Sequence, residues 1–138
     1  HMAHSIPACV ANGQVCNDFW LANRIKKYSP IIAVDGGLNH CDRLNILPDL
    51  MVGDFDSLGL GLREKYQDVP KIELNRAKDQ TDLEAALDSA VVQKASFCWI
   101  FAGLGGRLDH SLYNIYMLFR YPNKMFLETS EEVLFAVS

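Results

Sequence analysis

The chain has 138 residues, of which 49% are apolar and 22% charged, and its formal net charge at pH 7 is -4. This length fits one domain with a single core, and the composition excludes a disordered or fibrous chain. The acidic balance and the lack of a Lys/Arg-rich run argue against nucleic-acid binding, so we expect a small-molecule partner. The longest apolar stretch, 97–104, is too short to cross a bilayer.

The four cysteines form neither a CxxC pair nor a zinc-binding spacing. We interpret them as buried thiols in a reducing compartment. The N-terminus also lacks the basic and then apolar pattern of a signal peptide. The expected location is therefore the cytoplasm.

The first elements alternate between strand and helix. Residues 8–11 form an apolar run that ends at the turn pair Asn12-Gly13. Asn17 can cap a following helix, which Pro30 ends. The apolar face of this helix is predicted from the spacing of Trp20, Leu21, Ile25 and Tyr28.

The next two strands each end at acidic residues. Residues 31–34 are continuous and rich in β-branched side chains, as in a buried parallel strand, and Asp35 follows them before a helix that runs to about Asn45. Residues 50–52 form the second strand, with Asp54 and Asp56 just beyond its end. A polar helix and a short strand over 71–74 come next.

The clearest helix start is Thr81-Asp82-Leu83-Glu84, a capping box in which the first and last side chains satisfy backbone donors. The helix is predicted to continue through Ala90 and Val91. Asp82 lies in the first turn, where the positive end of the helix dipole favours its charged form.

The last third of the chain repeats the pattern. A strand over 97–102 leads through the loop 103–106 into a helix whose apolar face includes Leu112, Ile115, Leu118 and Phe119. Two further strands are predicted over 125–128 and 133–137. Successive β and α segments predict an open, mostly parallel, Rossmann-like sheet flanked by helices.

In such a sheet ligands bind beyond the carboxyl ends of the strands, where several predicted loops meet. Five carboxylates fall at this edge, and they would repel one another strongly unless a cation lay among them. Hard oxygen ligands suit Mg²⁺. Acidic residues also favour turns and helix caps, which is the alternative for each taken singly. The five are Asp35, Asp54, Asp56, Asp79 and Asp82.

The glycine loop 103–106 could be a simple turn, yet adjacent glycines before a helix also let backbone N–H groups approach a phosphate. It is neither a P-loop nor a dinucleotide fingerprint. Arg107 and His110 could be surface residues, but we favour a phosphate-facing role because guanidinium groups bind phosphate oxygens well. His40, within a short helix, is interpreted as an ordinary surface or core histidine.

Four motifs, in this order and spacing, resemble the thiamine pyrophosphokinase family. They are Asp35-Gly36-Gly37, the segment 53–57 (Gly-Asp-Phe-Asp-Ser), the segment 79–82 (Asp-Gln-Thr-Asp) and the segment 103–110 (Gly-Leu-Gly-Gly-Arg-Leu-Asp-His). The resemblance covers the chain from the first strand to about Tyr121. It implies a transferase that moves a pyrophosphoryl group from ATP to the hydroxyl of thiamine, forming thiamine diphosphate and AMP with Mg²⁺ as cofactor.

The resemblance also implies roles for individual residues. The implied metal ligands are Asp54, Asp56 and Asp82, and the implied catalytic residues are these three with Arg107 and Asp109. The implied nucleotide-binding residues are Asp35, Gly36, Gly37, Lys78, Asp79, Gln80, Thr81, Gly103, Gly105, Gly106 and His110.

The resemblance further implies that members of this family have two domains. In them an all-β domain follows the catalytic one and, in a homodimer, helps to enclose thiamine against the neighbouring subunit. We expect residues 1–138 to be the catalytic, ATP-binding domain, ending before that β-rich domain. The nucleotide and metal sites should then be present and the thiamine pocket incomplete.

Two alternatives remain open at the level of the sequence. Pyrophosphoryl transfer to a pterin alcohol could use the same metal and ATP edge with a different acceptor. A nucleotide-binding domain without turnover could keep the fold, although a module that only binds nucleotide rarely needs so many converging carboxylates.

Overall fold

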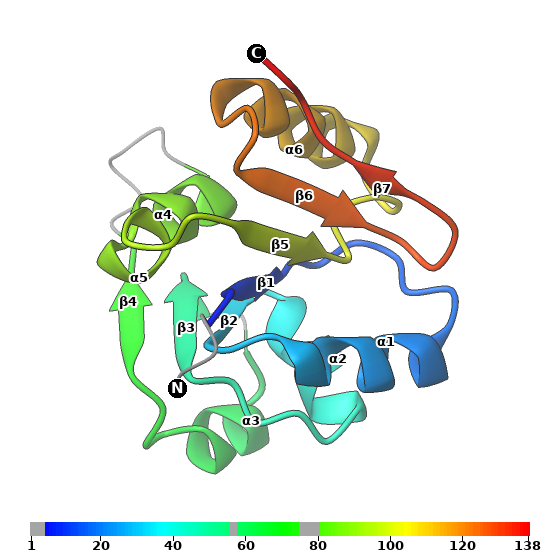
Figure 1. The fold of residues 1–138 in the computed structure, drawn as a ribbon. Helices are drawn as coiled ribbons and strands as arrows, with labels where there is room; N and C mark the ends of the chain where they lie inside the picture. The colour runs from blue at the N-terminus through cyan, green and yellow to red at the C-terminus, as the bar shows by residue number, and fades with distance from the viewer. Residues whose placement is uncertain (1–4, 56–57, 75–80) are drawn as a thin grey trace.

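A computed structural model describes residues 5–55, 58–74 and 81–138 of the chain. These residues form a sheet in the order β4-β3-β2-β1-β5-β6-β7 (Figure 1). All neighbours pair in parallel except β6 and β7, which are antiparallel. The strands are β1 (Ala8–Val10), β2 (Ile31–Val34), β3 (Leu50–Gly53), β4 (Lys71–Glu73), β5 (Cys98–Phe101), β6 (Met125–Glu128) and β7 (Val133–Leu134).

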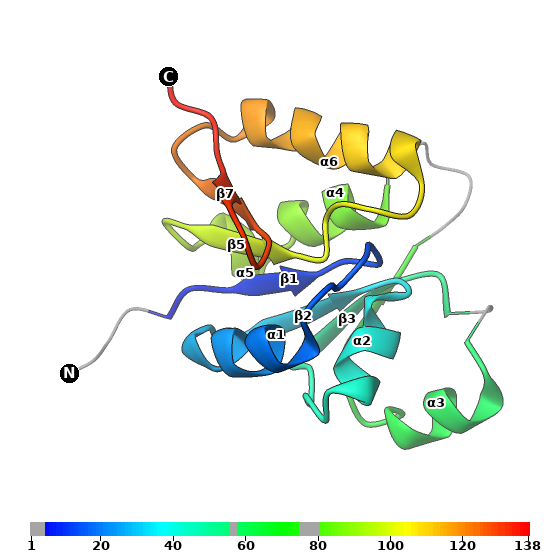
Figure 2. The same ribbon diagram turned by 90° about the vertical axis from the view of Figure 1, so that its right-hand side faces the viewer.

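Helices cover both faces of the sheet, which confirms the predicted fold class (Figure 2). One face carries α1 (Asp18–Arg24), its 3-10 extension η1 (Ile25–Lys27), α2 (Gly37–Arg43) and α3 (Leu60–Lys65). The other carries α4 (Asp82–Asp88), α5 (Ala90–Gln93) and α6 (Leu108–Arg120). Among the described residues, no helix has the length and apolarity needed to span a membrane.

The sheet separates two apolar cores because successive side chains of a strand point to opposite faces. In β1, Cys9 packs into the core beneath α4, α5 and α6, whereas Ala8 and Val10 pack into the core beneath α1 and α2. Both faces of the central strands are therefore buried, as their continuous apolar sequence predicts.

The helix caps in the structure agree in part with those predicted from the sequence. Asn17 Oδ1 accepts a hydrogen bond from the Trp20 N–H at 2.9 Å, and Thr81 Oγ1 accepts one from the Glu84 N–H at 3.1 Å. The reciprocal half of the capping box was predicted wrongly. The Glu84 carboxylate instead accepts from the Tyr113 hydroxyl and pairs with Arg120, which joins α4 to α6.

The other predicted strands agree with the structure to within one residue at each end, and two elements differ further. The helix that begins at Asp82 stops at Ser89, whose extended backbone (φ -63°, ψ 152°) separates α4 from α5. The last strand pairs only over Val133 and Leu134. Beyond them the Ala136 carbonyl accepts from the Asn123 N–H at 2.8 Å, so this segment bonds to the turn before β6 instead of extending the ladder.

The strand order places the topological switch point beside β1. From β1 the chain adds β2, β3 and β4 on one side and then crosses to add β5 and β6 on the other. The loops that leave β1 and β5 meet at this carboxyl edge, where the Gly13 N–H donates to the Ala102 carbonyl at 2.6 Å, and they lead to helices on opposite faces of the sheet (Figure 2). Ligands bind at this edge in open α/β sheets.

Candidate active site

A cavity of about 580 Å³ opens at the switch point, and we call it the central cavity. Its walls come from the loops after β1, β2 and β5 and from the first turns of α4 and α6. The polar and glycine residues that line it are Asn12, Gly13, Asp35, Thr81, Asp82, Gly103, Gly105, Gly106, Arg107, His110, Asn114 and Tyr113.

Acidic residues from separate elements converge on the β2–β3 side of the cavity. Asp35 follows β2 with a left-handed backbone (φ 49°), and Asp54 follows β3 just outside the cavity lining. Between them Gly53 (φ 145°) is held tightly, since a Cβ there would lie 3.1 Å from Asp35 Cα and 3.3 Å from Asp82 Oδ2. The positive φ at this residue and the short distances to its neighbours both favour glycine.

The described carboxylates are chemically suited to Mg²⁺, which prefers oxygen ligands. Asp82 Oδ2 lies against Gly53, and Asp54 is the next residue in the chain. Within the described ranges, no group of three or more His, Cys, Asp or Glu side chains forms a complete metal site. The third predicted ligand, Asp56, lies outside the described residues, as do Lys78, Asp79 and Gln80.

The glycine loop is held in place from α6 and from the β1 loop. Asn114 Nδ2 donates to the Gly103 carbonyl at 2.8 Å, and the Gln14 N–H donates to the Leu104 carbonyl, also at 2.8 Å. The Gly105 N–H donates to Ser111 Oγ at 3.1 Å and is thereby engaged. A Cβ on Gly106 would meet nothing within 4 Å, so the loop is open to a ligand at that residue.

Arg107 and Asp109 form an ion pair at the start of α6. Arg107 donates from Nε to Oδ1 at 3.1 Å and from Nη2 to Oδ2 at 2.6 Å. This guanidinium lowers the pKa of Asp109, so its carboxylate is ionised at neutral pH. Both side chains are largely exposed, and His110, next in the chain, is exposed as well and lines the central cavity.

Gly36 and Gly37 are packing residues in the structure and lie outside the cavity lining. A Cβ on Gly36 would collide with the Asn12 side chain, and one on Gly37 would collide with the Val10 carbonyl. They let the start of α2 rest against the end of β1.

Sequence reasoning missed the polar side chains of three cavity residues, Asn12, Tyr113 and Asn114. Asn12 follows β1 at the same edge as Asp35, so the rule that selected Asp35 could have selected it too. Asn114 lies one helical turn after His110 and shares its face of α6.

His40 of α2 supports the β1 loop. Its Nε2 lies 2.7 Å from the Gly13 carbonyl oxygen, and its buried Nδ1 makes no hydrogen bond to any described residue. Burial lowers the pKa of His40, the Gly13 carbonyl and Asp18 oppose this, and Arg43 lowers it further. A neutral ring that donates from Nε2 to Gly13 fits this geometry.

We expect His40 to make stability depend on pH. Its folded pKa lies below the ordinary 6.5, so the unfolded chain takes up the proton first as pH falls. The stability gained from the neutral ring is therefore present above 6.5 and declines below it. Denaturant unfolding at about pH 7 and about pH 5 measures the loss of stability between these two pH values. We expect a smaller loss in His40→Gln than in the unmodified chain, because glutamine keeps a hydrogen-bond donor and cannot titrate.

His110→Gln is the matched control, since this histidine is exposed. His110→Gln should lose as much stability as the unmodified chain when the pH is lowered. An equal decline in His40→Gln and the unmodified chain would mean that His40 does not carry the effect.

The parallel sheet, the cavity at its switch point and the acidic strand ends define a doubly wound α/β ligand-binding domain. The family model described as "Thiamin pyrophosphokinase, catalytic domain" matches residues 21–128. The chain belongs to this family.

Two relatives are similar in sequence. The chain is 38% identical over 91 residues to the thiamine pyrophosphokinase of Bacillus subtilis (strain 168), a match that covers 64% of this chain and 42% of the relative. It is 34% identical over 96 residues to thiamine pyrophosphokinase 3 of Oryza sativa subsp. japonica, a match that covers 63% of this chain and 36% of the relative. The matched region thus spans less than half the length of these relatives.

Solved structures agree with the fold. The thiamine pyrophosphokinase from Bacillus subtilis superposes with a TM-score of 0.75 at 30% identity, covering 91% of this chain and 61% of that chain. The thiamin pyrophosphokinase from Geobacillus thermodenitrificans superposes with a TM-score of 0.73 at 29% identity, covering 90% of this chain and 59% of that chain.

Proposed function

We propose that the chain transfers a pyrophosphoryl group from ATP to the hydroxyl of thiamine, giving thiamine diphosphate and AMP. The observation that carries this proposal is the family match over residues 21–128, a range that includes both the acidic edge and the glycine loop. The relatives that match are themselves named thiamine pyrophosphokinases.

In this reaction the thiamine hydroxyl oxygen forms a bond to the β-phosphorus of ATP. The bond from the β-phosphorus to the oxygen that bridges to the α-phosphorus breaks, and AMP leaves with the electron pair while the hydroxyl proton is lost. Negative charge spreads over the transferring oxygens, so catalysis consists mainly of alignment and electrostatic stabilisation.

We assign the phosphates to the glycine loop. Gly103, Gly105 and Gly106 would bring the phosphates to the N-terminal end of α6, where backbone N–H groups and the helix dipole favour anions. Arg107 would donate to phosphate oxygens. Its present partner, Asp109, is exposed, and exposed pairs are weak, so a phosphate can replace that carboxylate at small cost.

The acidic side of the cavity is assigned to Mg²⁺, with Asp54, Asp56 and Asp82 as ligands. When bound, the ion would neutralise charge on the phosphate oxygens. Asp35 and Thr81 would position the nucleotide together with Lys78, Asp79 and Gln80, and His110 would lie beside the phosphates. Gly36 and Gly37 would act indirectly, by holding Asn12 and the end of β1 in place.

We further propose that an all-β domain and a second subunit complete the thiamine pocket in a homodimer. An apolar stripe on α6 supports this, because large exposed patches beside a ligand cavity commonly mark an interface. Its residues are Leu108, Leu112, Tyr116 and Phe119. The predicted apolar face of this helix was therefore wrong in part, because Leu112 and Phe119 are exposed whereas Leu118 is buried. All four cysteines are free thiols, but Cys16 is exposed, so the prediction that all four are buried was wrong for this residue. Free thiols support a cytoplasmic location.

The function is tested by product analysis with enzyme in excess over ATP, so that a weakly bound acceptor still reacts. We expect AMP and thiamine diphosphate in equal amounts, formed only with both Mg²⁺ and thiamine. A hydroxymethylpterin offered in place of thiamine should yield no AMP. Metal-dependent nucleotide binding without any AMP, even at thiamine concentrations that saturate a weak site, would favour a binding domain and contradict the proposal.

A further inference from the structure

Side-chain bridges join α4 to α6, two helices that lie on the same face of the sheet (Figure 2). Near the central cavity, the Tyr113 hydroxyl donates to Glu84 Oε1 at 3.2 Å, and Arg120 pairs with Glu84 Oε2. At the far end of α4, the Tyr121 hydroxyl donates to Asp88 Oδ1 at 2.9 Å. We call the first of these, formed by Glu84, Tyr113 and Arg120, the Glu84 bridge.

The Glu84 bridge connects the elements that form two sides of the central cavity. Glu84 lies two residues after Asp82 in the first turn of α4, and Asp82 belongs to the acidic side of the cavity. Tyr113 lines the cavity from α6, and its neighbour Asn114 holds the Gly103 carbonyl of the glycine loop at 2.8 Å. The distance between the Glu84 carboxylate and Tyr113 therefore helps to set the separation of the acidic side from the glycine loop.

Burial favours one arrangement of the Glu84 bridge. The Glu84 side chain is only 15% exposed, and both of its carboxylate oxygens are engaged. Tyr113 is half-buried and packs against the core beneath α4, α5 and α6. Loss of either partner would leave part of the hydrogen-bonding capacity of a shielded carboxylate unmet. Asp88 is exposed, so water competes for its bond to Tyr121, and that bridge constrains the helices less.

The separation of the two sides matters for a ligand that touches both. In the proposed function, the acidic side and the glycine loop act on the same phosphates, and a misplacement of about 1 Å in such a site is costly. We propose that Glu84 is a positioning residue, which acts through Tyr113 and Arg120 to hold the start of α6 where a complex of metal and nucleotide can contact both sides. This inference depends on the proposed function and deepens it.

A bridge that only stabilises the fold would behave differently when it is broken. The free energy of unfolding would fall, and the folded fraction would bind ligands as before. Loss of a positioning bridge instead weakens a ligand that needs both sides and spares one that rests on a single side. The measurement is therefore the affinity for a non-hydrolysable ATP analogue with and without Mg²⁺, since the ratio of the two dissociation constants is the coupling between metal and nucleotide. Denaturant unfolding supplies the correction for the unfolded population.

The first test compares Tyr113→Phe with Tyr121→Phe. Each substitution removes one tyrosine hydroxyl that donates to a carboxylate of α4, and of the two tyrosines only Tyr113 lines the central cavity. We expect Tyr113→Phe to weaken binding of the analogue with Mg²⁺ about fivefold or more and to leave binding without Mg²⁺ unchanged. Tyr121→Phe should change neither affinity.

The second test changes Arg120, which does not line the central cavity and is linked to it through Glu84. Arg120→Leu removes the ion pair, whereas Arg120→Lys keeps a cation for Glu84 Oε2. We expect Arg120→Leu to weaken the analogue with Mg²⁺ about as much as Tyr113→Phe does, and Arg120→Lys to retain most of the affinity. This pair of variants separates positioning from a direct contact between Tyr113 and the ligand.

The outcomes separate this inference from the proposed function. If the unmodified chain binds the analogue with Mg²⁺ and both Tyr113→Phe and Arg120→Leu bind it equally well, the Glu84 bridge only stabilises the fold and the inference alone fails. Weakening in Tyr113→Phe but not in Arg120→Leu would also overturn it, because the Tyr113 hydroxyl would then serve the ligand directly. So would equal weakening in Tyr121→Phe. If the unmodified chain does not bind the analogue with Mg²⁺, both the proposed function and the inference fail.

Discussion

Replacing Asp82 with asparagine should abolish most metal-dependent nucleotide binding while the fold remains intact. Asp82 Oδ2 lies against Gly53 at the acidic edge, and asparagine keeps the shape of the side chain without its charge. Even outer partners of metal ligands cost about 10- to 100-fold in affinity when changed, so we expect a loss of roughly 100-fold or more for a direct ligand. Calorimetric titration with a non-hydrolysable ATP analogue and Mg²⁺ measures it.

Stability should change little in Asp82→Asn, because asparagine keeps the shape of the side chain and an oxygen that can accept hydrogen bonds, and because two effects of the charge oppose each other. The carboxylate gains about 0.3–1 kcal/mol from the positive end of the helix dipole, and it is repelled by the neighbouring carboxylates. Its position in the first turn of α4, outside the two cores, also limits the effect on packing.

The matched control is Asp88→Asn, at the opposite end of the same helix. Asp88 accepts from the Tyr121 hydroxyl at 2.9 Å and does not line the central cavity. Its replacement should leave nucleotide affinity unchanged. Normal Mg²⁺-dependent binding by Asp82→Asn would remove this residue from the metal site.

The sequence predicts the strands and their common edge well, because both depend on local patterns. The predicted bounds of β2 and β6 match the structure, and Asp35 and Asp82 reach the same cavity from separate elements. Apolar runs and helix caps depend on residues that are close in sequence, and the parallel topology then brings the carboxyl ends of the strands to one edge.

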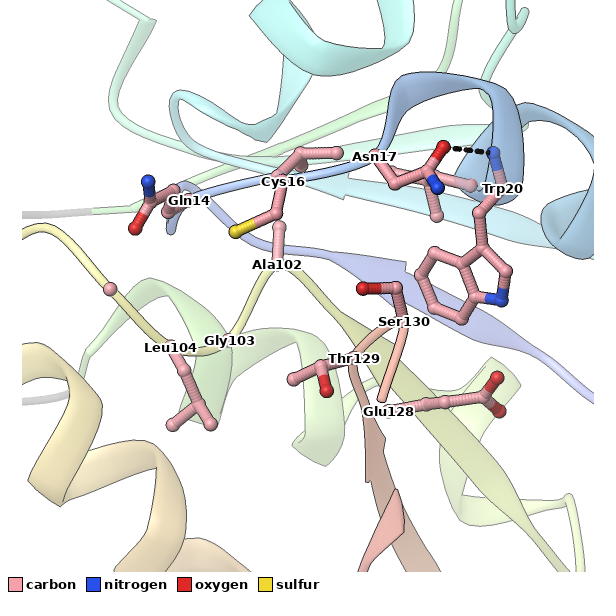
Figure 3. A pocket seen from close by; sticks show the side chains of 13 residues that line it. Gln14, Cys16, Asn17, Trp20, Ala102, Gly103, Leu104, Glu128, Thr129 and Ser130 are labelled. Carbon is pink, nitrogen blue, oxygen red and sulfur yellow. Dashed lines mark hydrogen bonds between the residues drawn. The ribbon is translucent and has the colours of Figure 1, made fainter. Parts of the chain in front are cut away.

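Side-chain partners could not be predicted in the same way. Glu84 has the spacing of a capping box, yet it bonds to Tyr113 and Arg120 of α6, which are distant in sequence. The Arg107–Asp109 pair competes with the expected phosphate contact. A smaller cavity of about 140 Å³, bounded by Trp20, Leu104 and Glu128 (Figure 3), combines α1, the glycine loop and the end of β6, and the sequence carries no motif for it.

The glycine pair after Asp35 has a packing role in the structure. The resemblance implies nucleotide binding for Gly37, whereas the structure buries it against β1. A Cβ there would overlap the Val10 carbonyl oxygen and lie 2.8 Å from the Val10 carbonyl carbon. Because the new Cβ would meet backbone atoms of a central strand, neither a rotamer change nor a loop shift can relieve the overlap.

We therefore expect Gly37→Ala to lower the free energy of unfolding by about 2–3 kcal/mol, the upper range for overpacking a tight core. Denaturant unfolding measures this loss. Gly61→Ala is the control, since Gly61 lies in α3 with nothing within 4 Å of its would-be Cβ. Alanine there should raise stability by about 0.5–1 kcal/mol through helix propensity.

The same variant separates packing from binding. If Gly37 acts through packing, the folded fraction of Gly37→Ala should bind the ATP analogue within a few-fold of the unmodified chain, after correction for the unfolded population. Full stability with lost nucleotide affinity would instead mean that the Gly37 backbone contacts the ligand. The α2 N-terminus would then have to face the central cavity, although its described position is behind Asn12, against β1.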